Sequence, residues 1–312
     1  MKIIELKSDA MRVTISDFGA RILDWQVQVN GSYRSIVLKY NNEEDYLSDQ
    51  FYLGAIVGPF ANRIKDGRVD IRESQVLHLD RNEGLNHLHG GENAIDKQVW
   101  QITRCSQSAV RLELVIQDMW NGYPGALELT AEYTLENNRL RLRVSALSEK
   151  DTVAGMSAHS YFNLNGVNSH RGGLEQWLTT CATHVNINDS NGLPIRPPQS
   201  VKHTQYDYSK RYLLTQQRGS EVLDNNFIFS NSCSKAILES FDRYLKLEVS
   251  SDYPAMQLYT GGHLSEPFCK NQSVCIEPQF GPDMPNCKNH PLGLLPANTL
   301  QQHIIDYTIT TE

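Results

Sequence analysis

The sequence has 312 residues, of which 40% are hydrophobic and 21% are charged, and its formal net charge is −7. This acidic balance excludes a surface built for nucleic acid or for an anionic membrane, because binding to phosphate groups needs clustered lysine and arginine side chains. The length fits either two average domains or one large β-sandwich, so the number of domains has to be inferred from the predicted secondary structure.

The first forty residues have the pattern of short β-strands. Residues 2–7, 11–16 and 21–29 alternate apolar and polar side chains, which is the period of a strand with one buried face. Asn30-Gly31 predicts a tight type I′ turn into a further strand at 33–40. The chain is therefore expected to begin with antiparallel strands.

The N-terminal segment does not have the pattern of a secretory signal. Lys2, Glu5, Lys7 and Asp9 interrupt its apolar residues. No later stretch approaches the roughly 18 consecutive apolar residues of a transmembrane helix. We therefore expect a soluble, cytoplasmic protein without a membrane partner.

The clearest hairpin lies in the middle of the chain. Residues 126–136 alternate apolar and polar side chains, Asn137 and Asn138 can form a tight turn, and residues 139–144 alternate back. One face of this hairpin should be core, and the other should be solvated by glutamate and arginine side chains. A short helix is expected only at 45–52.

The remaining chain continues the β pattern. Further strands are expected at 68–79, 98–104, 109–117, 177–187, 236–239, 244–250, 255–260 and 300–310. The irregular stretch 186–212 contains three prolines and is expected to be a loop at the rim. Strands without intervening helices predict an all-β fold, and we expect a single domain spanning 1–312, a large antiparallel β-sandwich with few short helices.

A short strand near the C-terminal end delivers a carboxylate just before the chain breaks on prolines. Cys275 and Glu277 share one face of this strand, and its other face is apolar. Pro278 has no N–H for a ladder bond, so the strand is expected to end at or just after Glu277. The carboxylate would then lie at the sheet rim, in water or facing a cleft.

Two polar patches in the first third of the chain are candidates for binding a ligand. Asn62 and Arg63 follow a segment with two glycines and a proline, and the guanidinium fork of Arg63 suits sugar hydroxyls as well as bulk water. His87 and His89 lie on one side of an extended chain before two glycines. Ligand contact by His89 is favoured over a metal site because no third ligand is visible. The role of His87 stays open.

Two further patches lie in the second half. His159 shares a strand face with Ser157, Tyr161 and Asn163, a wholly polar or aromatic face that suits an oriented imidazole as well as a solvated edge. Asp224 precedes two asparagines, so it can form an Asx turn or belong to a site.

Several kinds of chemistry have no motif in the sequence. It contains no P-loop, no G-x-G-x-x-G and no G-x-S-x-G segment, and no recognisable set of metal ligands. We therefore expect neither a cofactor nor a metal. Asp224 and Glu277 could still form the carboxylate pair of a glycosidase.

Taken in order, these patches resemble the aldose 1-epimerase (galactose mutarotase) family from about residue 54 to residue 286. The resemblance implies an isomerase on a large β-sandwich that interconverts the α and β anomers of free aldoses such as galactose or glucose, without metal or cofactor. Carried over by motif position, it implies Glu277 as general base, His159 as general acid, and Arg63, His89 and Asp224 as substrate contacts, with Asn62 beside them.

The reaction explains the need for two proton-transfer groups. Anomerisation opens a hemiacetal, so one proton must leave the C1 hydroxyl while another reaches the ring oxygen. The unperturbed pKa values of glutamate and histidine, about 4.3 and 6.5, make a carboxylate and an imidazolium accessible near neutrality. Each proton transfer can contribute about 10²–10⁴ in rate.

Three departures from the family pattern leave the preferred aldose open. Ala158 stands where asparagine is common, and Pro59 and the stretch 261–263 also differ. The alternatives to an epimerase are a glycoside-processing enzyme that uses Asp224 and Glu277, and a non-catalytic carbohydrate-binding protein. The expected partner is a small aldose, and the sequence does not indicate the oligomeric state.

Overall fold

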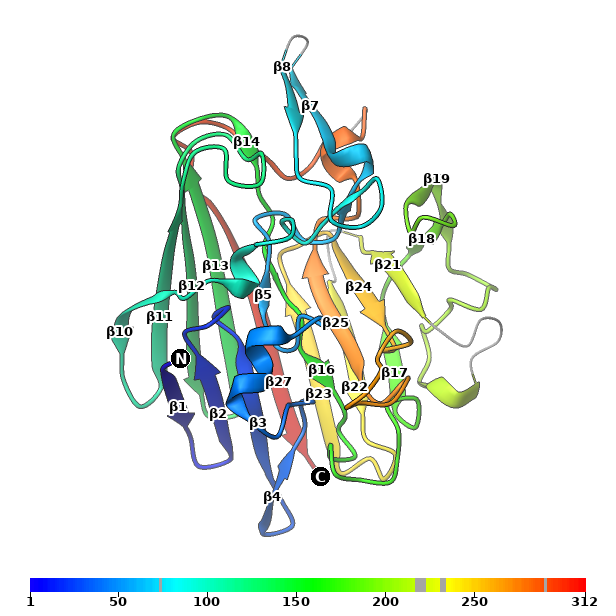
Figure 1. Ribbon diagram of the computed structural model, residues 1–312. Helices are drawn as coiled ribbons and strands as arrows, with labels where there is room; N and C mark the ends of the chain where they lie inside the picture. Colours follow the sequence, from blue (N-terminus) through cyan, green and yellow to red (C-terminus); the bar gives the residue numbers. More distant parts are fainter. Residues whose placement is uncertain (73–74, 217–222, 231–233, 289–290) are drawn as a thin grey trace.

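The computed structural model describes residues 1–72, 75–216, 223–230, 234–288 and 291–312. Antiparallel β-sheets dominate this part of the chain, and β24 (Ala255–Tyr259) and β25 (Val274–Gln279) lie in front of β22 (Lys235–Glu239) and β23 (Leu245–Ser251) in Figure 1. The prediction of a large antiparallel β-sandwich with few short helices is confirmed.

Two sheets form the layers of the sandwich. The nine-stranded sheet has the order β10 (Gln101–Cys105), β11 (Ala109–Ile116), β12 (Leu127–Glu136), β13 (Arg139–Ser148), β27 (Gln301–Thr311), β23, β22, β17 (Trp177–Thr180) and β20 (Tyr212–Leu213). The six-stranded sheet has the order β16 (Tyr161–Phe162), β25, β24, β21 (Asp224–Ile228), β18 (His184–Asn188) and β19 (Pro194–Ser200).

Smaller sheets flank the two layers. The N-terminal strands β1 (Ile3–Lys7), β2 (Met11–Ser16), β3 (Ile22–Val29) and β4 (Ser32–Ser35) form a four-stranded sheet. Four two-stranded pairs join β5 (Ile56–Val57) to β15 (Ser157–Ala158), β6 (Arg63–Ile64) to β9 (His87–Leu88), β7 (Arg68–Arg72) to β8 (Gln75–His78), and β14 (Thr152–Val153) to β26 (Leu294–Leu295).

The helical segments are short 3₁₀ turns. They are η1 (Glu43–Ser48), η2 (Lys65–Gly67), η3 (Ile95–Lys97), η4 (Leu214–Gln216) and η5 (Met284–Asn286). The helix expected at 45–52 is therefore the shorter turn η1. A membrane-spanning helix, which would need greater length and apolarity, is absent from the described ranges.

One buried aromatic contact joins three sheets. Trp25 from β3 meets Phe162 of the six-stranded sheet at 6.2 Å between ring centroids, and Tyr307 of the nine-stranded sheet at 5.8 Å, both edge to face. Such arrangements stabilise a core beyond the area they bury. The layers are thus fixed to one another through side chains from distant parts of the sequence.

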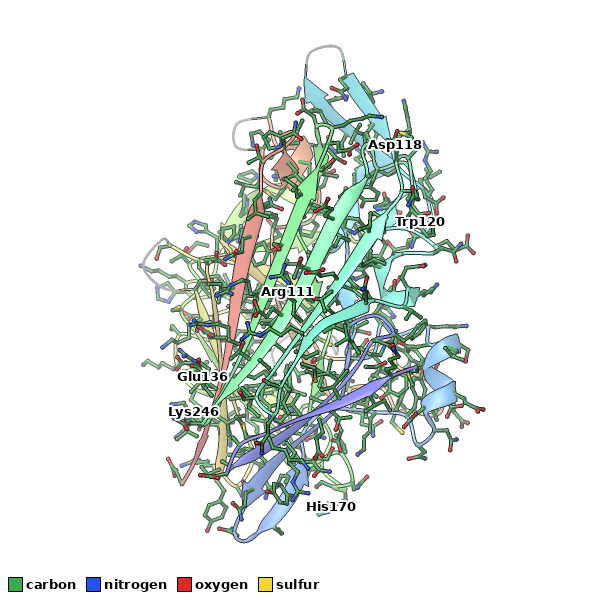
Figure 2. All side chains as sticks on the ribbon, turned by 90° about the vertical axis from the view of Figure 1, so that its left-hand side faces the viewer. Arg111, Asp118, Trp120, Glu136, His170 and Lys246 are labelled. Carbon is green, nitrogen blue, oxygen red and sulfur yellow. The ribbon has the colours of Figure 1, made fainter. Side chains whose placement is uncertain are left out.

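The predicted central hairpin is present as β12 and β13. Buried and partly exposed residues alternate along both strands, as the sequence pattern required. On the outer face Arg143 pairs with Glu132 at 3.1 Å and Arg141 with Asp306 at 2.8 Å. Figure 2 shows this side of the molecule, with Glu136 labelled near the end of the hairpin.

Two predicted strands are each a pair of strands. The range 68–79 is the hairpin of β7 and β8, and the residues between them, 73–74, lie outside the described residues. The range 177–187 is divided between β17 of the nine-stranded sheet and β18 of the six-stranded sheet. Both ranges were wrongly predicted as single strands, for different reasons: the prediction for 68–79 missed the turn of a hairpin within one sheet, and alternation along 177–187 could not report which sheet each part joins.

The stretch 186–212 is not wholly a loop. It contains β19, which pairs with β18 at the edge of the six-stranded sheet. Pro194 is the first residue of this edge strand, and Pro197 and Pro198 lie where its register with β18 is irregular, positions at which a sheet tolerates a missing N–H.

The strand that carries Glu277 extends beyond the predicted end. β25 continues through Pro278 to Gln279, so Glu277 lies inside the sheet instead of at its rim. The neighbouring β16 pairs only with Val274 and Cys275, so the missing N–H of Pro278 costs no ladder bond on that side. The carbonyl of Pro278 accepts a hydrogen bond of 2.8 Å from the Ser157 hydroxyl instead.

Candidate functional site

A cavity of about 300 Å³ lies on the face of the six-stranded sheet that points away from the core. Strands β21, β24 and β25 form one wall, and the segments around η1, β6, β9 and β15 form the others. All six residues selected from the sequence line it: Asn62, Arg63, His89, His159, Asp224 and Glu277. Residues from positions 50 to 277 therefore meet in one place.

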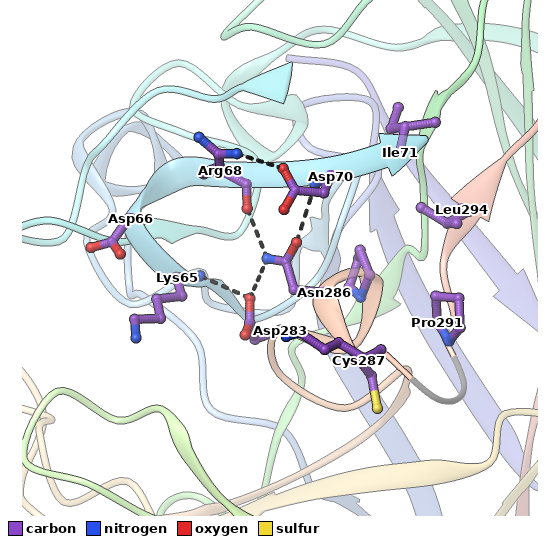
Figure 3. A pocket seen from close by; sticks show the side chains of 12 residues that line it. Lys65, Asp66, Arg68, Asp70, Ile71, Asp283, Asn286, Cys287, Pro291 and Leu294 are labelled. Atoms are coloured by element: carbon purple, nitrogen blue, oxygen red, sulfur yellow. Dashed lines mark hydrogen bonds and ion pairs between the residues drawn. The ribbon is translucent and has the colours of Figure 1, made fainter. Parts of the chain in front are cut away.

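A larger hollow of about 540 Å³ lies beside η5 and β7 (Figure 3). Its polar groups bind one another: Arg68 pairs with Asp70 at 2.8 Å, and the Asn286 amide donates to Asp283 at 2.7 Å. In the smaller cavity, by contrast, a buried carboxylate oxygen of Glu277 has no hydrogen-bond partner. This contrast selects the smaller cavity as the candidate site.

Glu277 is the most deeply buried carboxylate of the site, with 2% of the residue exposed. Burial and the nearby charge of Asp224 raise the pKa of Glu277 well above its ordinary value, although Arg63 opposes this shift. A carboxyl group of this kind binds a proton strongly and is aimed into a cavity, which suits proton transfer.

His159 lies opposite Glu277 in the gap between β15 and β16. Its Nε2 is 3.8 Å from Glu277 Oε2, too far for a direct hydrogen bond, and its Nδ1 is 3.7 Å from the sulfur of Cys275. Burial lowers the pKa of His159 to about 4, against smaller opposing effects that include the charges of Asp49 and Asp224. Above this pH the imidazole is neutral.

His89 is a permanent hydrogen-bond donor toward the cavity. The backbone N–H of Asn62 donates to His89 Nδ1 at 3.1 Å, so the ring proton must be on Nε2. Burial and the neighbouring charges of His159 and Arg63 lower the pKa of His89 well below its ordinary value. The ring therefore stays neutral and offers Nε2–H to an oxygen acceptor.

This tautomer also bears on metal binding. Ligand atoms of His89, His159 and Glu277 lie within 4.8 Å of one another, a grouping that can be considered for a metal ion. A metal needs a nitrogen lone pair, but the lone pair of His89 already accepts the Asn62 N–H and its other nitrogen carries a proton. The donor set therefore does not fit a metal.

Arg63 is fixed by a partner that the sequence analysis missed. Its Nε and Nη2 bind the two carboxylate oxygens of Glu83, each at 2.7 Å. Burial alone would lower the pKa of Arg63, but the hydrogen bonds and charge of Glu83, with the charge of Asp224, raise it. A methyl group built on Gly192 would come within 2.7 Å of the guanidinium, so a glycine is needed there for close approach.

Asp224 and Gln257 continue the polar wall beside Glu277. Asp224 lies in strand β21 instead of an Asx turn, and its Oδ1 accepts a hydrogen bond of 2.6 Å from the Gln257 amide. Gln257 is directly opposite Glu277 across the ladder, and its Oε1 has no hydrogen-bond partner. The signal for Gln257 was present in the sequence, as an amide within an otherwise apolar strand.

Tyr52 is an aromatic wall of the cavity. Its ring lies 4.8 Å from the ring of His89 and 5.8 Å from that of His159.

His87 points away from the cavity. Its nitrogens contact the Asp80 carbonyl at 2.6 Å and the Tyr123 hydroxyl at 2.7 Å. His87 is a buried structural residue in this arrangement.

The departures from the family pattern differ in their distance from the site. Ala158 belongs to the hydrophobic core, so it does not line the cavity. His263 does line it, and its backbone N–H donates to the Tyr259 hydroxyl at 2.7 Å. The stretch 261–263 is therefore the departure that can touch a bound molecule.

Comparisons with known proteins identify the family of the chain. A family profile described as aldose 1-epimerase matches residues 2–308. The chain is 31% identical to an aldose 1-epimerase from Haemophilus influenzae over 302 residues, covering 91% of this chain and 88% of that protein. It is also 31% identical to a galactose mutarotase from Rattus norvegicus over 306 residues, covering 93% and 89%.

Solved structures give the same result for the fold. The crystal structure of an aldose epimerase homologue from C. elegans superposes with a TM-score of 0.93 at 23% identity, covering 99% of both chains. A galactose 1-epimerase from Lactobacillus acidophilus superposes with a TM-score of 0.85 at 28% identity, covering 99% of this chain and 94% of that one.

Proposed function

The chain belongs to the aldose 1-epimerase family and is an isomerase, and from this premise we propose that Glu277 and His159 move the protons when a free aldose changes anomer in the cavity. The observation that carries the proposal is the 3.8 Å gap between Glu277 Oε2 and His159 Nε2. Both side chains are buried and line one cavity, so an acid and a base can act on the same substrate.

Ring opening follows from this pair. Glu277 as carboxylate accepts the proton of the C1 hydroxyl while His159 as imidazolium donates from Nε2 to the ring oxygen, and the C1–O5 bond breaks to give the open aldehyde. Rotation about C1–C2 presents the other face of the carbonyl. The ring then closes with the two roles exchanged, which restores the starting protonation states.

The remaining cavity residues would hold the sugar in place. Arg63 offers guanidinium N–H groups, His89 offers Nε2–H, and Asp224 is an acceptor for a hydroxyl. Asn62 supports this set through its backbone N–H to His89, and Gln257 adds a free amide oxygen. A buried site of fixed donors and acceptors discriminates hydroxyl patterns because an unmatched group stays unpaired.

Polarimetry tests the proposal. Freshly dissolved α-D-galactose or α-D-glucose should drift to its equilibrium rotation faster with the protein than without it. A carbohydrate-binding protein would leave the drift unchanged, and a glycosidase using Asp224 and Glu277 would release reducing sugar from a glycoside instead. Rates across D-galactose, D-glucose, D-xylose and L-arabinose would define the preferred aldose.

We also propose that residues 1–312 act as one domain. One hydrophobic cluster extends from Leu6 to Ile309, and the cavity needs residues from both halves of the chain. A core shared in this way is typical of a single folding unit.

The pH dependence should follow the proton count of the Glu277 and His159 pair. In the reacting state the pair shares one titrating proton, which is either on the Glu277 carboxyl or on His159 as an imidazolium. These two forms interconvert without taking up a proton from solvent, so the ratio between them does not change with pH. Activity should fall below about pH 4, where His159 takes up a second proton. It should also fall at high pH, once the pH passes the raised pKa of Glu277 and the pair holds none.

The measurement is kcat/KM by polarimetry from pH 3.5 to 9, extrapolated to zero buffer because buffers also catalyse the reaction. We expect a flat region through mildly acidic pH and two limbs. A steady rise of kcat/KM with pH across the whole range would contradict the shared-proton account. The wild-type protein without substrate, checked by circular dichroism at each pH, controls for unfolding.

A methyl group at Gly192 should weaken substrate binding through Arg63. Gly192→Ala pushes the guanidinium away from its position, and a lost hydrogen bond to a charged group is worth about 1.5–3 kcal/mol, so KM should rise about tenfold or more. Gly31→Ala is the matched control, since Gly31 also has a positive φ, +80° against +73°, but has no neighbour within 4 Å of the added carbon. Equal KM values for the two variants would contradict the claim that a side chain at position 192 weakens substrate binding through Arg63.

Chelation should leave the activity intact. The proton on His89 Nε2 makes the buried trio a poor metal site, so dialysis against EDTA is expected to leave kcat unchanged. Elemental analysis of the dialysed protein shows whether metal was removed. Activity that disappeared with EDTA and returned with a divalent ion would overturn the tautomer assignment.

A further inference from the structure

The side chain of Cys275 lies against the proposed general acid. Cys275 and Glu277 are two positions apart on β25, so both point to the same face of the sheet. His159 lies between them: Nδ1 is 3.7 Å from the Cys275 sulfur, and Nε2 is 3.8 Å from Glu277 Oε2. One strand therefore contacts both nitrogens of the imidazole.

The thiol is an uncharged partner. Cys275 has no exposed surface, and burial together with the charge of Glu277 raises the pKa of its thiol well above the ordinary value. The other groups around the His159 ring are the aromatic rings of Tyr161 and Tyr52, at 5.0 and 5.8 Å, and the ring of His89 at 5.5 Å. Cys275 is thus the side-chain partner that the structure gives to Nδ1, and the carbonyl of His159 itself is a second acceptor for the ring.

We propose that Cys275 is a positioning residue that accepts Nδ1–H of His159 and so keeps Nε2 as the nitrogen that gains and loses the catalytic proton. The inference rests on the proposed function of His159. A ring whose Nδ1 proton is held by an acceptor can exchange a proton only at Nε2, the nitrogen that faces Glu277 and the cavity.

The choice of sulfur has a chemical consequence. Histidines that act in catalysis are commonly oriented by a carboxylate or a carbonyl, and a carboxylate favours the imidazolium and so raises the pKa of the ring. A thiol is a weak, neutral acceptor. It orients the ring without adding negative charge, and His159 therefore remains a strong acid toward the ring oxygen.

Two substitutions separate orientation from packing. Cys275→Val keeps an apolar side chain of similar size but cannot accept Nδ1–H, so kcat should fall about tenfold with KM little changed. Cys275→Ser restores an acceptor, and kcat should recover to within a few-fold of wild type. Because a hydroxyl oxygen is the stronger acceptor, the acidic limb of the pH profile should move to higher pH in Cys275→Ser.

The decisive readout is independent of activity. In protein labelled with ¹⁵N-histidine, the imidazole nitrogens of His159, assigned by their loss in His159→Asn, should report the Nδ1–H tautomer in wild type and in Cys275→Ser. In Cys275→Val the Nε2–H form should gain population. Cys105→Val, which changes an exposed thiol, is the control and should leave both the spectrum and kcat unchanged.

Two results would overturn the inference: the same His159 tautomer in wild type and Cys275→Val, or full activity of a folded Cys275→Val. If Cys275→Val does not fold, the wild-type spectrum alone decides, since an Nε2–H tautomer there contradicts the proposal. Full activity of His159→Asn would instead contradict the proposed function of His159. The tautomer measurement would still test, independently of that result, whether Cys275 accepts Nδ1–H.

Discussion

Glu277→Gln is expected to lower kcat by about 10²-fold or more while leaving sugar affinity much less affected. Glutamine keeps the size of the side chain and its capacity for hydrogen bonds, but it cannot accept the C1 proton. The substitution also removes a buried group whose raised pKa reports a large cost of charging, so the variant should fold at least as well as wild type.

Anomerase kinetics on the folded variant test this expectation. Circular dichroism and thermal melting establish that Glu277→Gln has the native fold, and polarimetry gives kcat and KM. Gln279→Glu cannot serve as a rescue control for Glu277→Gln. Gln279 does not line the cavity, so a carboxylate at position 279 would not replace the one lost at position 277. A Glu277→Gln protein with nearly wild-type kcat would remove the carboxylate from the mechanism.

His159→Asn should reduce kcat to a similar extent. Asparagine is polar and smaller than histidine, but it cannot donate a proton to the ring oxygen as an imidazolium does. Because Glu277 and His159 act on one event, the double variant should lose far less than the product of the two single losses. Groups that act as a unit are non-additive in this way.

The double-mutant cycle uses four proteins and one assay. The wild type, the two single variants and the double variant are compared in kcat under the same buffer, with the uncatalysed rate subtracted. Full multiplicativity of the two losses would show that the two groups contribute independently and do not act as a unit. His87→Asn is a useful fifth protein outside the cycle, since His87 is bonded outside the cavity and its loss should lower stability before it lowers kcat.

Local sequence pattern carried much of the fold, and the family resemblance supplied the roles expected in the cavity. Alternation located β12 and β13 because each residue there reports its own face, and His159 stood on a polar or aromatic strand face. Asp224 was selected by its place in the family motif, because its local sequence suited an Asx turn as well. Period and composition are properties of a short window, and they could be read without knowing what the window packs against.

Contacts between distant segments could not be read in this way. Glu83 binds Arg63 and Gly192 leaves room for its guanidinium, although both residues are distant from Arg63 in the sequence. The local sequence around Glu83 and Gly192 does not indicate that either of them contacts Arg63. The division of 177–187 between two sheets is likewise a tertiary choice. The position of Glu277 inside β25 depended on where β16 stops, which is a property of another strand.

The alternation along β25 makes the site sensitive to strand register. Cys275 and Glu277 point to the face of the sheet that carries the cavity, which Glu277 lines, while Val274 and Ile276 face the main core, so a slip of one residue would exchange the two sets. During refolding, a misregistered chain would have nearly normal far-ultraviolet dichroism and no anomerase activity. Recovered activity is therefore a more stringent measure of correct assembly than recovered secondary structure.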